Sequence, residues 1–442
     1  MIDSFGRDTS HLRDSKGEHP PEFATHCIAA VEELFGKAWL EGAEGQPGHR
    51  LQKLWERKDW LSTCELFGLG KCILLLTPKH NIWLNQTAKK IKSGVANAHG
   101  FITEILTCGS IRTNKGEVYP APGNQKGFDF VVDFPSGFKY YISIKSQGMA
   151  LHELTFHELG DRLKEAFAQR LEFLGVDGEL YLQSTTHIDS DVFEYLIKFV
   201  GSVLKTPKTY TYRGCQLIFR KLPKSDKAYA SCYRSHQVTI SCPHHRNTLK
   251  NATSKLADAA KNMGLHLPCS DDYFRYLWIR VHSSTEVAVL EEAAKKMLDD
   301  DLRDYGFDGV FFIQPSVIRT ESSSEINTYL SVAAAGLHQG YNRAIKEGRV
   351  SLITMDVPVG GLSLKPSELH ITNGKITVPL PSNYYFYQKA DMYFLMERDG
   401  DEMVGEWSSP ASGIRHHIVY ADGHKETLFP SPAVEVEETL II

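Results

Sequence analysis

Residues 127–146, which read GFDFVVDFPSGFKYYISIKS, constrain the fold more than any other stretch of this 442-residue chain. Apolar and acidic side chains alternate from Phe128 to Phe134, a Pro-Ser-Gly turn follows, and Tyr140 to Lys145 is rich in aromatic and β-branched residues. A period of two on both sides of a Pro-Ser-Gly turn is typical of a β-hairpin. We therefore predict two antiparallel strands that close around Ser136.

This closure fixes the register of the two strands. It places Asp133 opposite Lys139 and Asp129 opposite Ser143. Opposed residues have Cβ atoms about 5 Å apart, so Asp129, Ser143 and Lys145 are expected to share one polar patch. Taken alone, a carboxylate opposite a lysine is most often a solvated ion pair worth less than about 1 kcal/mol. The other face is predicted to be buried, with Phe128, Phe130, Val132, Phe134, Ile142 and Ile144.

The composition favours a globular protein of the cytoplasm. Hydrophobic residues make up 42% of the chain and aromatic residues 11%, which is enough to build a core. No run approaches the roughly 18 apolar residues of a membrane span, and the polar N-terminus does not match a signal peptide. The eight cysteines are scattered without close pairs, as in proteins with reduced thiols.

Changes of pattern predict a mixed α/β protein with five segments. We expect a single helix over residues 84–106 and a strand at Glu179–Gln183, which gives the order α, β, β, β, α, β, α from residue 90 onward. A further helix is expected at 325–346. The five segments are a flexible tail (1–21), a helical N-terminal region (22–94), a core (95–205), a second αβ region (206–315) and a helix followed by a β-rich C-terminal region (316–442).

Three elements of the predicted core carry a family motif. Glu104 near the end of a helix, Asp129 at the start of a strand, and Ser143-Ile144-Lys145 on the next strand resemble the motif of the PD-(D/E)XK, or restriction-endonuclease-like, nuclease superfamily. The resemblance covers about a quarter of the chain and implies an αβββαβ core. It also implies that Asp129 binds Mg²⁺ or Mn²⁺, that Lys145 orients or activates the attacking water, and that Glu104 is a further carboxylate beside them. Hard oxygen ligands of this kind suit Mg²⁺.

One position departs from the pattern. The family has Asp or Glu two residues before the lysine, where this chain has Ser143. Serine is a poor metal ligand, and some members with serine at this position recruit a glutamate from the following helix. Glu158 is the first candidate for that ligand, with Glu153 and Glu165 as further candidates.

The resemblance implies a metal-dependent endonuclease that cleaves DNA in restriction or anti-phage defence. Its partners would then be nucleic acid and either a second copy of the chain or a defence-system protein. Two alternatives stay open. The residues do not separate a DNase from an RNase, and Ser143 favours a catalytically inactive protein that binds nucleic acid or scaffolds a complex.

Residues 198–261 form a strongly basic segment, with 13 basic and 2 acidic side chains. Phosphates attract such a segment, and unpaired bases can stack on its interleaved aromatic residues. A solvated basic surface is the alternative. We expect a nucleic-acid track that leads to the core and includes Lys205, Lys208, Arg213, Arg220, Lys221, Lys224 and Lys227.

Overall fold

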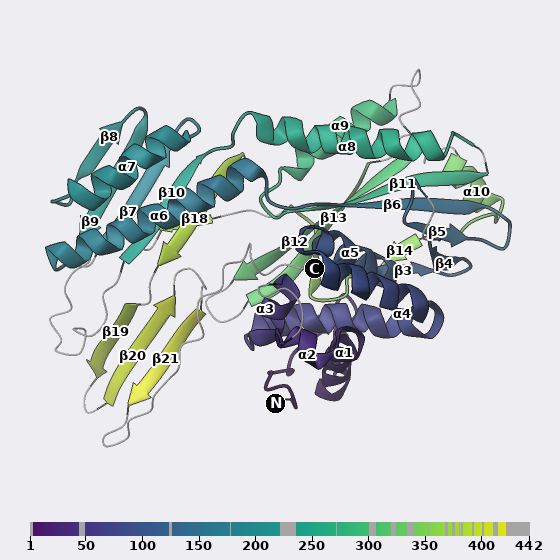
Figure 1. Cartoon of the computed structure of the whole chain (residues 1–442), viewed down its shortest axis with the longest axis horizontal. Coiled ribbons are helices and arrows are strands. Elements are labelled where there is room, and N and C mark those ends of the chain that lie inside the picture. The colour runs from purple at the N-terminus through teal and green to yellow at the C-terminus, as the bar shows by residue number, and fades with distance from the viewer. Residues whose placement is uncertain are drawn as a thin grey trace.

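Two mixed β-sheets carry the fold in the computed structural model of this chain (Figure 1). The larger sheet has seven strands in the order β15-β13-β12-β11-β6-β5-β4, and the second has five in the order β18-β10-β7-β9-β8. The structure describes residues 3–43, 49–122, 126–176, 178–221, 236–270, 272–299, 306–319, 324–333, 340–351, 353–366, 370–373, 376–379, 381, 383–390, 393–399, 402–409 and 414–420.

The N-terminal region is helical, as predicted, and its helices cross closely. An alanine Cβ at Gly70 on α4 would lie 1.8 Å from the carbonyl oxygen of Cys27 on α1, and one at Gly109 on α5 would lie 2.5 Å from Cβ of Cys72 on α4. Only glycine permits these two approaches. The helices are α1 (Pro21–Phe35), α2 (Lys37–Leu40), α3 (Arg50–Glu56), α4 (Trp60–Ser93) and α5 (Val95–Ser110).

The predicted hairpin forms two neighbouring strands of the seven-stranded sheet, next to the edge strand β4, and its register is confirmed. Val131 pairs with Tyr141 and Asp133 with Lys139 between antiparallel β5 and β6. The other edge of β6 pairs in parallel with β11, which in turn runs parallel to β12. The strands of this sheet are β4 (Glu117–Pro120), β5 (Phe130–Asp133), β6 (Lys139–Gln147), β11 (Tyr273–Val281), β12 (Gly309–Arg319), β13 (Ser324–Ala333) and β15 (Gly361–Ser363).

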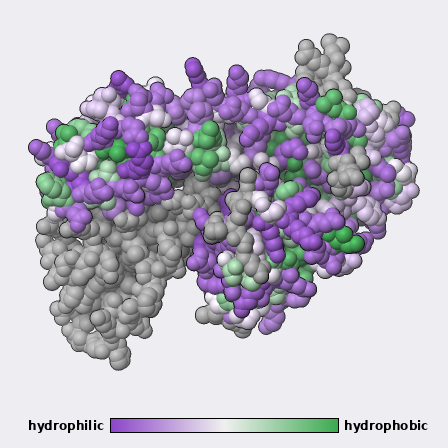
Figure 2. Space-filling view, in the orientation of Figure 1, coloured by the Kyte–Doolittle hydropathy of each residue, from purple (hydrophilic) through white to green (hydrophobic). Residues whose placement is uncertain are grey.

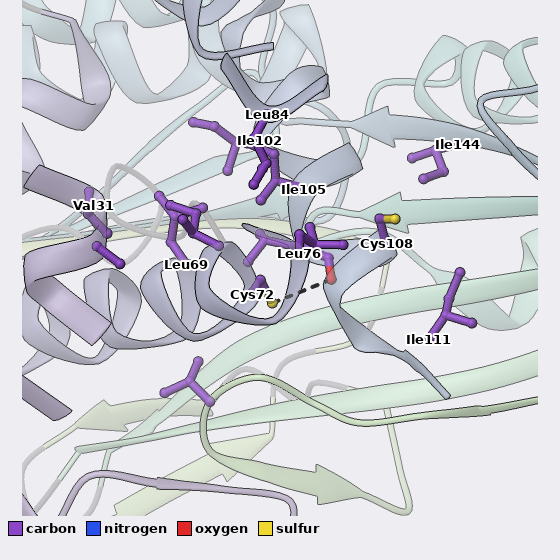
Figure 3. Packing of buried hydrophobic residues seen from close by; sticks show 14 of the residues in the cluster. Val31, Leu69, Cys72, Leu76, Leu84, Ile102, Ile105, Cys108, Ile111 and Ile144 are labelled. Atoms are coloured by element: carbon purple, nitrogen blue, oxygen red, sulfur yellow. Dashed lines mark hydrogen bonds between the residues drawn. The ribbon is translucent and has the colours of Figure 1, made fainter. Parts of the chain in front are cut away.

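Helices cover both faces of this sheet. Ile142 and Ile144 of β6 pack into a core with α4 and α5, and Figure 3 shows Ile144 on the side of Cys108 of α5. Leu277 and Ile279 of β11 face the opposite way, against α8 (Asn247–His266) and α9 (Val287–Asp299). Figure 1 shows α8 and α9 on the side of the sheet opposite α4 and α5.

The second sheet belongs to a lobe with a hydrophobic core of its own. Helices α6 and α7 pack against this sheet, and parallel β7 and β10 lie at its centre. The elements of the lobe are α6 (Leu151–Leu174), β7 (Gly178–Ser184), α7 (Ser190–Ser202), β8 (Thr209–Tyr212), β9 (Cys215–Lys221), β10 (His236–Pro243) and β18 (Tyr384–Ala390).

Short strands and one small helix complete the described chain. Strand β3 pairs with β14, β16 pairs with β17, and β19, β20 and β21 form an antiparallel sheet, in line with the β-rich C-terminal region that was expected. These elements are β1 (Arg13–Asp14), β2 (Gly17–Glu18), β3 (Ile111–Thr113), α10 (Gly340–Lys346), β14 (Ile353–Met355), β16 (His370–Asn373), β17 (Ile376–Pro379), β19 (Tyr393–Asp399), β20 (Glu402–Ser409) and β21 (Ile414–Tyr420).

Hydrophilic residues cover most of the described surface in the view of Figure 2. Helix α4 is long and apolar enough to cross a membrane by length and composition, but 78% of its most apolar window is buried inside the structure. The apolar residues of α4 therefore pack in the core of the helical region.

The predicted core differs from the structure in two places. Four strands instead of three lie between α5 and α6, because the short β3, which pairs with β14, precedes β4. Strand β7 has the expected position 179–183 but lies in the second sheet instead of beside β6. The neighbour of β6 is β11, which the sequence places in the second αβ region. The apolar side chains of a strand do not indicate which sheet the strand joins, so this pairing was not predictable from the local pattern.

Three further expectations were wrong. Residues 3–20 are not a free tail, because Arg7 is fully buried and donates to the carbonyl oxygens of α3, while the buried Asp14 pairs with Lys71. The helix expected over 84–106 is two helices separated at Gly94, which has an extended backbone. The first part of the helix expected over 325–346 is strand β13, because apolar residues four apart fit either period.

Candidate functional site

Asp129 lies where β5 and β6 separate. Strand β5 begins at Phe130, which pairs with Ile142, and the backbone N–H of Asp129 donates to the carbonyl oxygen of Ile142 at 2.8 Å. Among the described residues, no strand pairs with β6 on this edge beyond that point. The Asp129 carboxylate occupies this edge. Its Oδ2 accepts a hydrogen bond from the backbone N–H of Ile144 at 2.6 Å and one from the Ser143 hydroxyl at 3.3 Å. The hairpin therefore fixes the orientation of a carboxylate that is still 30% exposed.

Ser143 and Lys145 complete the polar patch that the register predicts. The Lys145 ammonium donates to Ser143 Oγ and to the carbonyl oxygen of Ile144, both at 3.0 Å. Its Nζ lies 4.0 Å from Oδ2 of Asp129, and the side chain is 40% exposed. Ser143 itself is buried and bridges the cation and the carboxylate. Charged groups of both signs are thus held at one solvent-accessible point.

Glu104 approaches this patch from α5. Burial and the negative charge of Asp129 raise the pKa of Glu104 to about 7, while the nearby cations Lys90 and Lys145 act in the opposite direction. The two carboxylates are therefore close enough to repel each other in a partly buried setting. A divalent cation between them would relieve this repulsion.

The donor set fits magnesium or manganese better than a softer metal. Asp129 and Glu104 offer only carboxylate oxygens, and Mg²⁺ is usually held by one or two carboxylates together with waters and substrate phosphates. In the described part of the chain, no group of three or more His, Cys, Asp and Glu side chains could hold a metal ion. A bound metal would therefore need ligands from water or from the substrate.

The structure does not bring Glu158 to this patch. Glu158 is exposed on α6, a helix whose buried side chains pack in the core of the second lobe. It is not among the charges that act on Glu104, whereas Asp129, Lys90 and Lys145 are. Glu165 is likewise exposed on α6. Glu153, in the first turn of α6, is buried and accepts a hydrogen bond from the Ser284 hydroxyl at 2.9 Å.

The predicted nucleic-acid track lies on the second lobe. All five described cations of the track are exposed: Lys205 and Lys208 precede β8, Arg213 lies in the turn between β8 and β9, and Arg220 and Lys221 end β9. The Lys208 ammonium lies 4.9 Å from the ring centre of Tyr210, and the Arg213 guanidinium lies 5.5 Å from that of Tyr212. Cations and aromatic rings therefore do alternate at this edge of the sheet. Lys224 and Lys227 lie outside the described residues.

The sequence did not predict one charged residue that lies close to the patch. Lys90, near the end of α4, lowers the pKa of Glu104 and so lies close to the patch. A lysine on a polar helical stretch carries no signal of such a role, because the approach depends on the turn at Gly94 that sets α5 against α4. The structural role of Ser143 was also missed, since the sequence indicates only that a carboxylate is lacking there.

No protein-family model matches this chain. No curated protein and no solved structure matches it either. The function must therefore be argued from the geometry of the patch.

Proposed function

We propose that this chain is a metal-dependent phosphodiesterase, a nuclease of the PD-(D/E)XK kind, whose active site is formed by Asp129, Glu104 and Lys145. The observation that carries the proposal is the convergence of two mutually repelling carboxylates and one lysine at the open edge of β6. Mg²⁺ or Mn²⁺ would be held by Asp129 and Glu104. When bound, such an ion activates water and neutralises charge on the phosphodiester.

The residues of the chain have separate roles in this proposal. Asp129 is oriented by the Ile144 N–H, so one of its oxygens is fixed before any metal arrives. Lys145 provides a positive charge beside the carboxylates, where it can stabilise the negative charge that develops on the phosphate. Ser143 keeps the lysine next to Asp129 through its two hydrogen bonds.

The order of elements supports the proposal in a modified form. Residues between β6 and α8 build the second lobe, and α8 then leads directly into β11, the parallel neighbour of β6. If this lobe is an insertion, the elements α5, β4, β5, β6, α8 and β11 give the αβββαβ order of the proposed family. The core would then be completed by α8 and β11 in place of α6 and β7.

Nucleic acid is the proposed substrate, bound in part by the exposed cations that flank β8 and end β9. The preference for DNA over RNA, the role in defence and the cytoplasmic location rest on the resemblance and the composition alone. A second candidate function is a catalytically inactive nucleic-acid-binding or scaffolding protein. It is favoured by Ser143, whose hydroxyl occupies the position of the usual second carboxylate.

The test is cleavage by purified protein with Mg²⁺, Mn²⁺ or EDTA. Plasmid, linear duplex, single-stranded DNA and RNA are each incubated with the parent and with Asp129→Asn and Lys145→Met. We expect metal-dependent cleavage by the parent and a loss of at least about 100-fold in each variant. Asp133→Asn and Lys139→Met are matched controls, because this pair lies 3.7 Å apart on the same hairpin, away from the patch.

Two results would contradict the proposed enzymatic activity. One is undiminished cleavage by Asp129→Asn. The other is the absence of cleavage by the parent with every metal and substrate, which together with retained nucleic-acid binding would support the inactive alternative.

A further inference from the structure

A group of aromatic side chains lies at the outer edge of the second lobe, where α7 meets β8. Strand β8 is an edge strand of the five-stranded sheet, and Figure 1 shows it at the end of the lobe that lies away from β4 and β5. Tyr195 and Phe199 are four residues apart and share one face of α7. Tyr210 and Tyr212 are two residues apart and share one face of β8. The two faces meet, because Tyr195 contacts Tyr212 and Phe199 contacts Tyr210.

Two of these rings are stacked face to face. The ring centres of Tyr195 and Tyr212 lie 3.9 Å apart, and the ring planes differ by 18°. Phe199 is nearly parallel to Tyr195, but its ring centre lies 6.4 Å away, so it flanks Tyr195 and does not cover it. Tyr212 also packs against the core of the lobe, which holds the pair in place. Tyr195 is still 44% exposed, so a further planar group can stack on it.

The surroundings of this pair are positively charged. Residues 195–221 contain six basic and no acidic side chains. The Arg213 guanidinium lies 5.5 Å from the ring centre of Tyr212 and 3.0 Å from Oδ2 of Asp191. Both partners of this ion pair are more than half exposed, and exposed pairs contribute little free energy. Arg213 can therefore exchange Asp191 for a phosphate at little cost.

We propose that Tyr195 and Tyr212, with Lys208 and Arg213 beside them, form a stacking site for the unpaired bases of a single-stranded nucleic acid. Aromatic rings stack on the faces of unpaired bases, whereas a duplex keeps those faces covered by neighbouring base pairs. The cations beside the rings attract the phosphates that connect the bases. This site rests on the proposed function in one respect, namely that the substrate is nucleic acid, and it narrows that substrate to a strand with unpaired bases.

A protein partner is the other class of ligand that binds exposed aromatic rings. The charges favour nucleic acid. The central part of a protein interface is depleted of charged side chains, whereas here the exposed cations Lys208 and Arg213 lie directly beside the rings of Tyr210 and Tyr212. Association with another protein is therefore an outcome against which the site is tested.

Binding is measured by fluorescence anisotropy of labelled oligonucleotides in EDTA, so that neither metal nor cleavage is needed. The ligands are a deoxyuridine strand, a stable abasic strand of the same length, and a duplex of that length. The two single strands carry the same number of phosphates, so a difference between them reports contacts with bases. We expect the parent to bind the deoxyuridine strand at least about fivefold more tightly than the abasic strand, as for the stacking of one base.

The variants separate stacking from charge. Tyr195→Leu and Tyr212→Leu keep an apolar side chain without a ring, and each should bind the deoxyuridine strand at least about fivefold more weakly than the parent. Their affinities for the abasic strand and the duplex should not change. Tyr195→Phe keeps the ring and should bind like the parent. Lys208→Gln should flatten the slope of log affinity against log salt by about 0.7 for both single strands. Tyr119→Leu is the matched control, because Tyr119 is 41% exposed on β4 of the other sheet.

Two results would overturn the stacking site. One is equal binding of the deoxyuridine and abasic strands by the parent, or tyrosine-to-leucine variants that bind the deoxyuridine strand like the parent. The other is self-association of the parent in sedimentation that Tyr195→Leu abolishes, without binding of any strand, which would assign the rings to a protein interface. A uridine strand differs from the deoxyuridine strand only in its 2′-hydroxyl groups, so base-dependent binding of one or both identifies the strand as RNA, DNA or either.

The cleavage assay decides the nuclease separately. Base-dependent binding in EDTA without cleavage in Mg²⁺ or Mn²⁺ would retain the stacking site and refute the enzyme. Metal-dependent cleavage without base-dependent binding would retain the enzyme and overturn the stacking site.

Discussion

Replacement of Glu104 by glutamine should stabilise the metal-free protein at alkaline pH. Glu104 has a pKa of about 7 in the folded chain against an ordinary value of 4.5, because of burial and the charge of Asp129. Between these values the folded state holds the proton more tightly than the unfolded state. Stability therefore falls as the pH rises from 4.5 through 7.

The size of the effect follows from the two pKa values. At 1.36 kcal/mol per pH unit, ionised Glu104 costs the folded state up to about 3 kcal/mol above pH 7. Glutamine keeps the shape of the side chain and cannot ionise. The two proteins should therefore unfold at nearly the same urea concentration near pH 4, and the variant should be more stable by up to about 3 kcal/mol at pH 8.

The assay is urea unfolding followed by tryptophan fluorescence at several pH values, with and without Mg²⁺. A metal that binds ionised Glu104 and Asp129 should stabilise the parent at pH 8 more than it stabilises Glu104→Gln. The difference in free energy of unfolding between the two proteins should therefore become smaller when Mg²⁺ is added. Glu158→Gln, which removes an exposed glutamate, is the control. A constant difference between parent and Glu104→Gln at all pH values, or a variant that is less stable at pH 8, would refute the reasoning.

Three further predictions concern the patch, the helical core and the basic edge. Ser143→Asp should destabilise the metal-free protein, because it adds a buried carboxylate beside Asp129. The same variant should bind Mn²⁺ more tightly in a calorimetric titration, and an unchanged Mn²⁺ affinity would count against a metal at this patch. Gly70→Ala should lower the free energy of unfolding by about 1–3 kcal/mol through its clash with Cys27, whereas Gly94→Ala, which meets no atom within 4 Å, should not show this clash. If the basic edge binds phosphates, replacement of Lys205, Lys208 and Lys221 by glutamine should flatten the slope of log affinity for duplex DNA against log salt by up to about 3, and an unchanged slope would remove these lysines from the path.

The patch was predictable where it depends on local sequence. A turn at Ser136 and a period of two fix which residues of β5 and β6 face each other, so Asp129, Ser143 and Lys145 could be placed together from the sequence. The approach of Glu104 could be expected only by resemblance, because it depends on how α5 packs on the sheet. The predicted ligand Glu158 also depends on how its helix packs. The structure does not place it at the patch, because α6 packs in the core of the second lobe.

The remainder of the sheet was not predictable because its pairing is distant in sequence. The hairpin gives β6 its antiparallel neighbour within about 20 residues, but its parallel neighbour β11 follows more than 120 residues later. Nothing in the alternating pattern of a strand specifies a partner at that distance, since every buried strand presents similar apolar faces.

This separation has a chemical consequence. On the antiparallel side of β6 lie the groups that a single hairpin brings together, namely Asp129, Ser143 and Lys145. On the parallel side, Arg280 pairs with Ser146 in the strand ladder and its side chain contacts His99 only once β11 has joined the sheet. The two edges of β6 are therefore completed by segments far apart in the sequence. The proposed active site depends only on the hairpin edge and on the packing of α5, so it is the part of this sheet that local sequence specifies best.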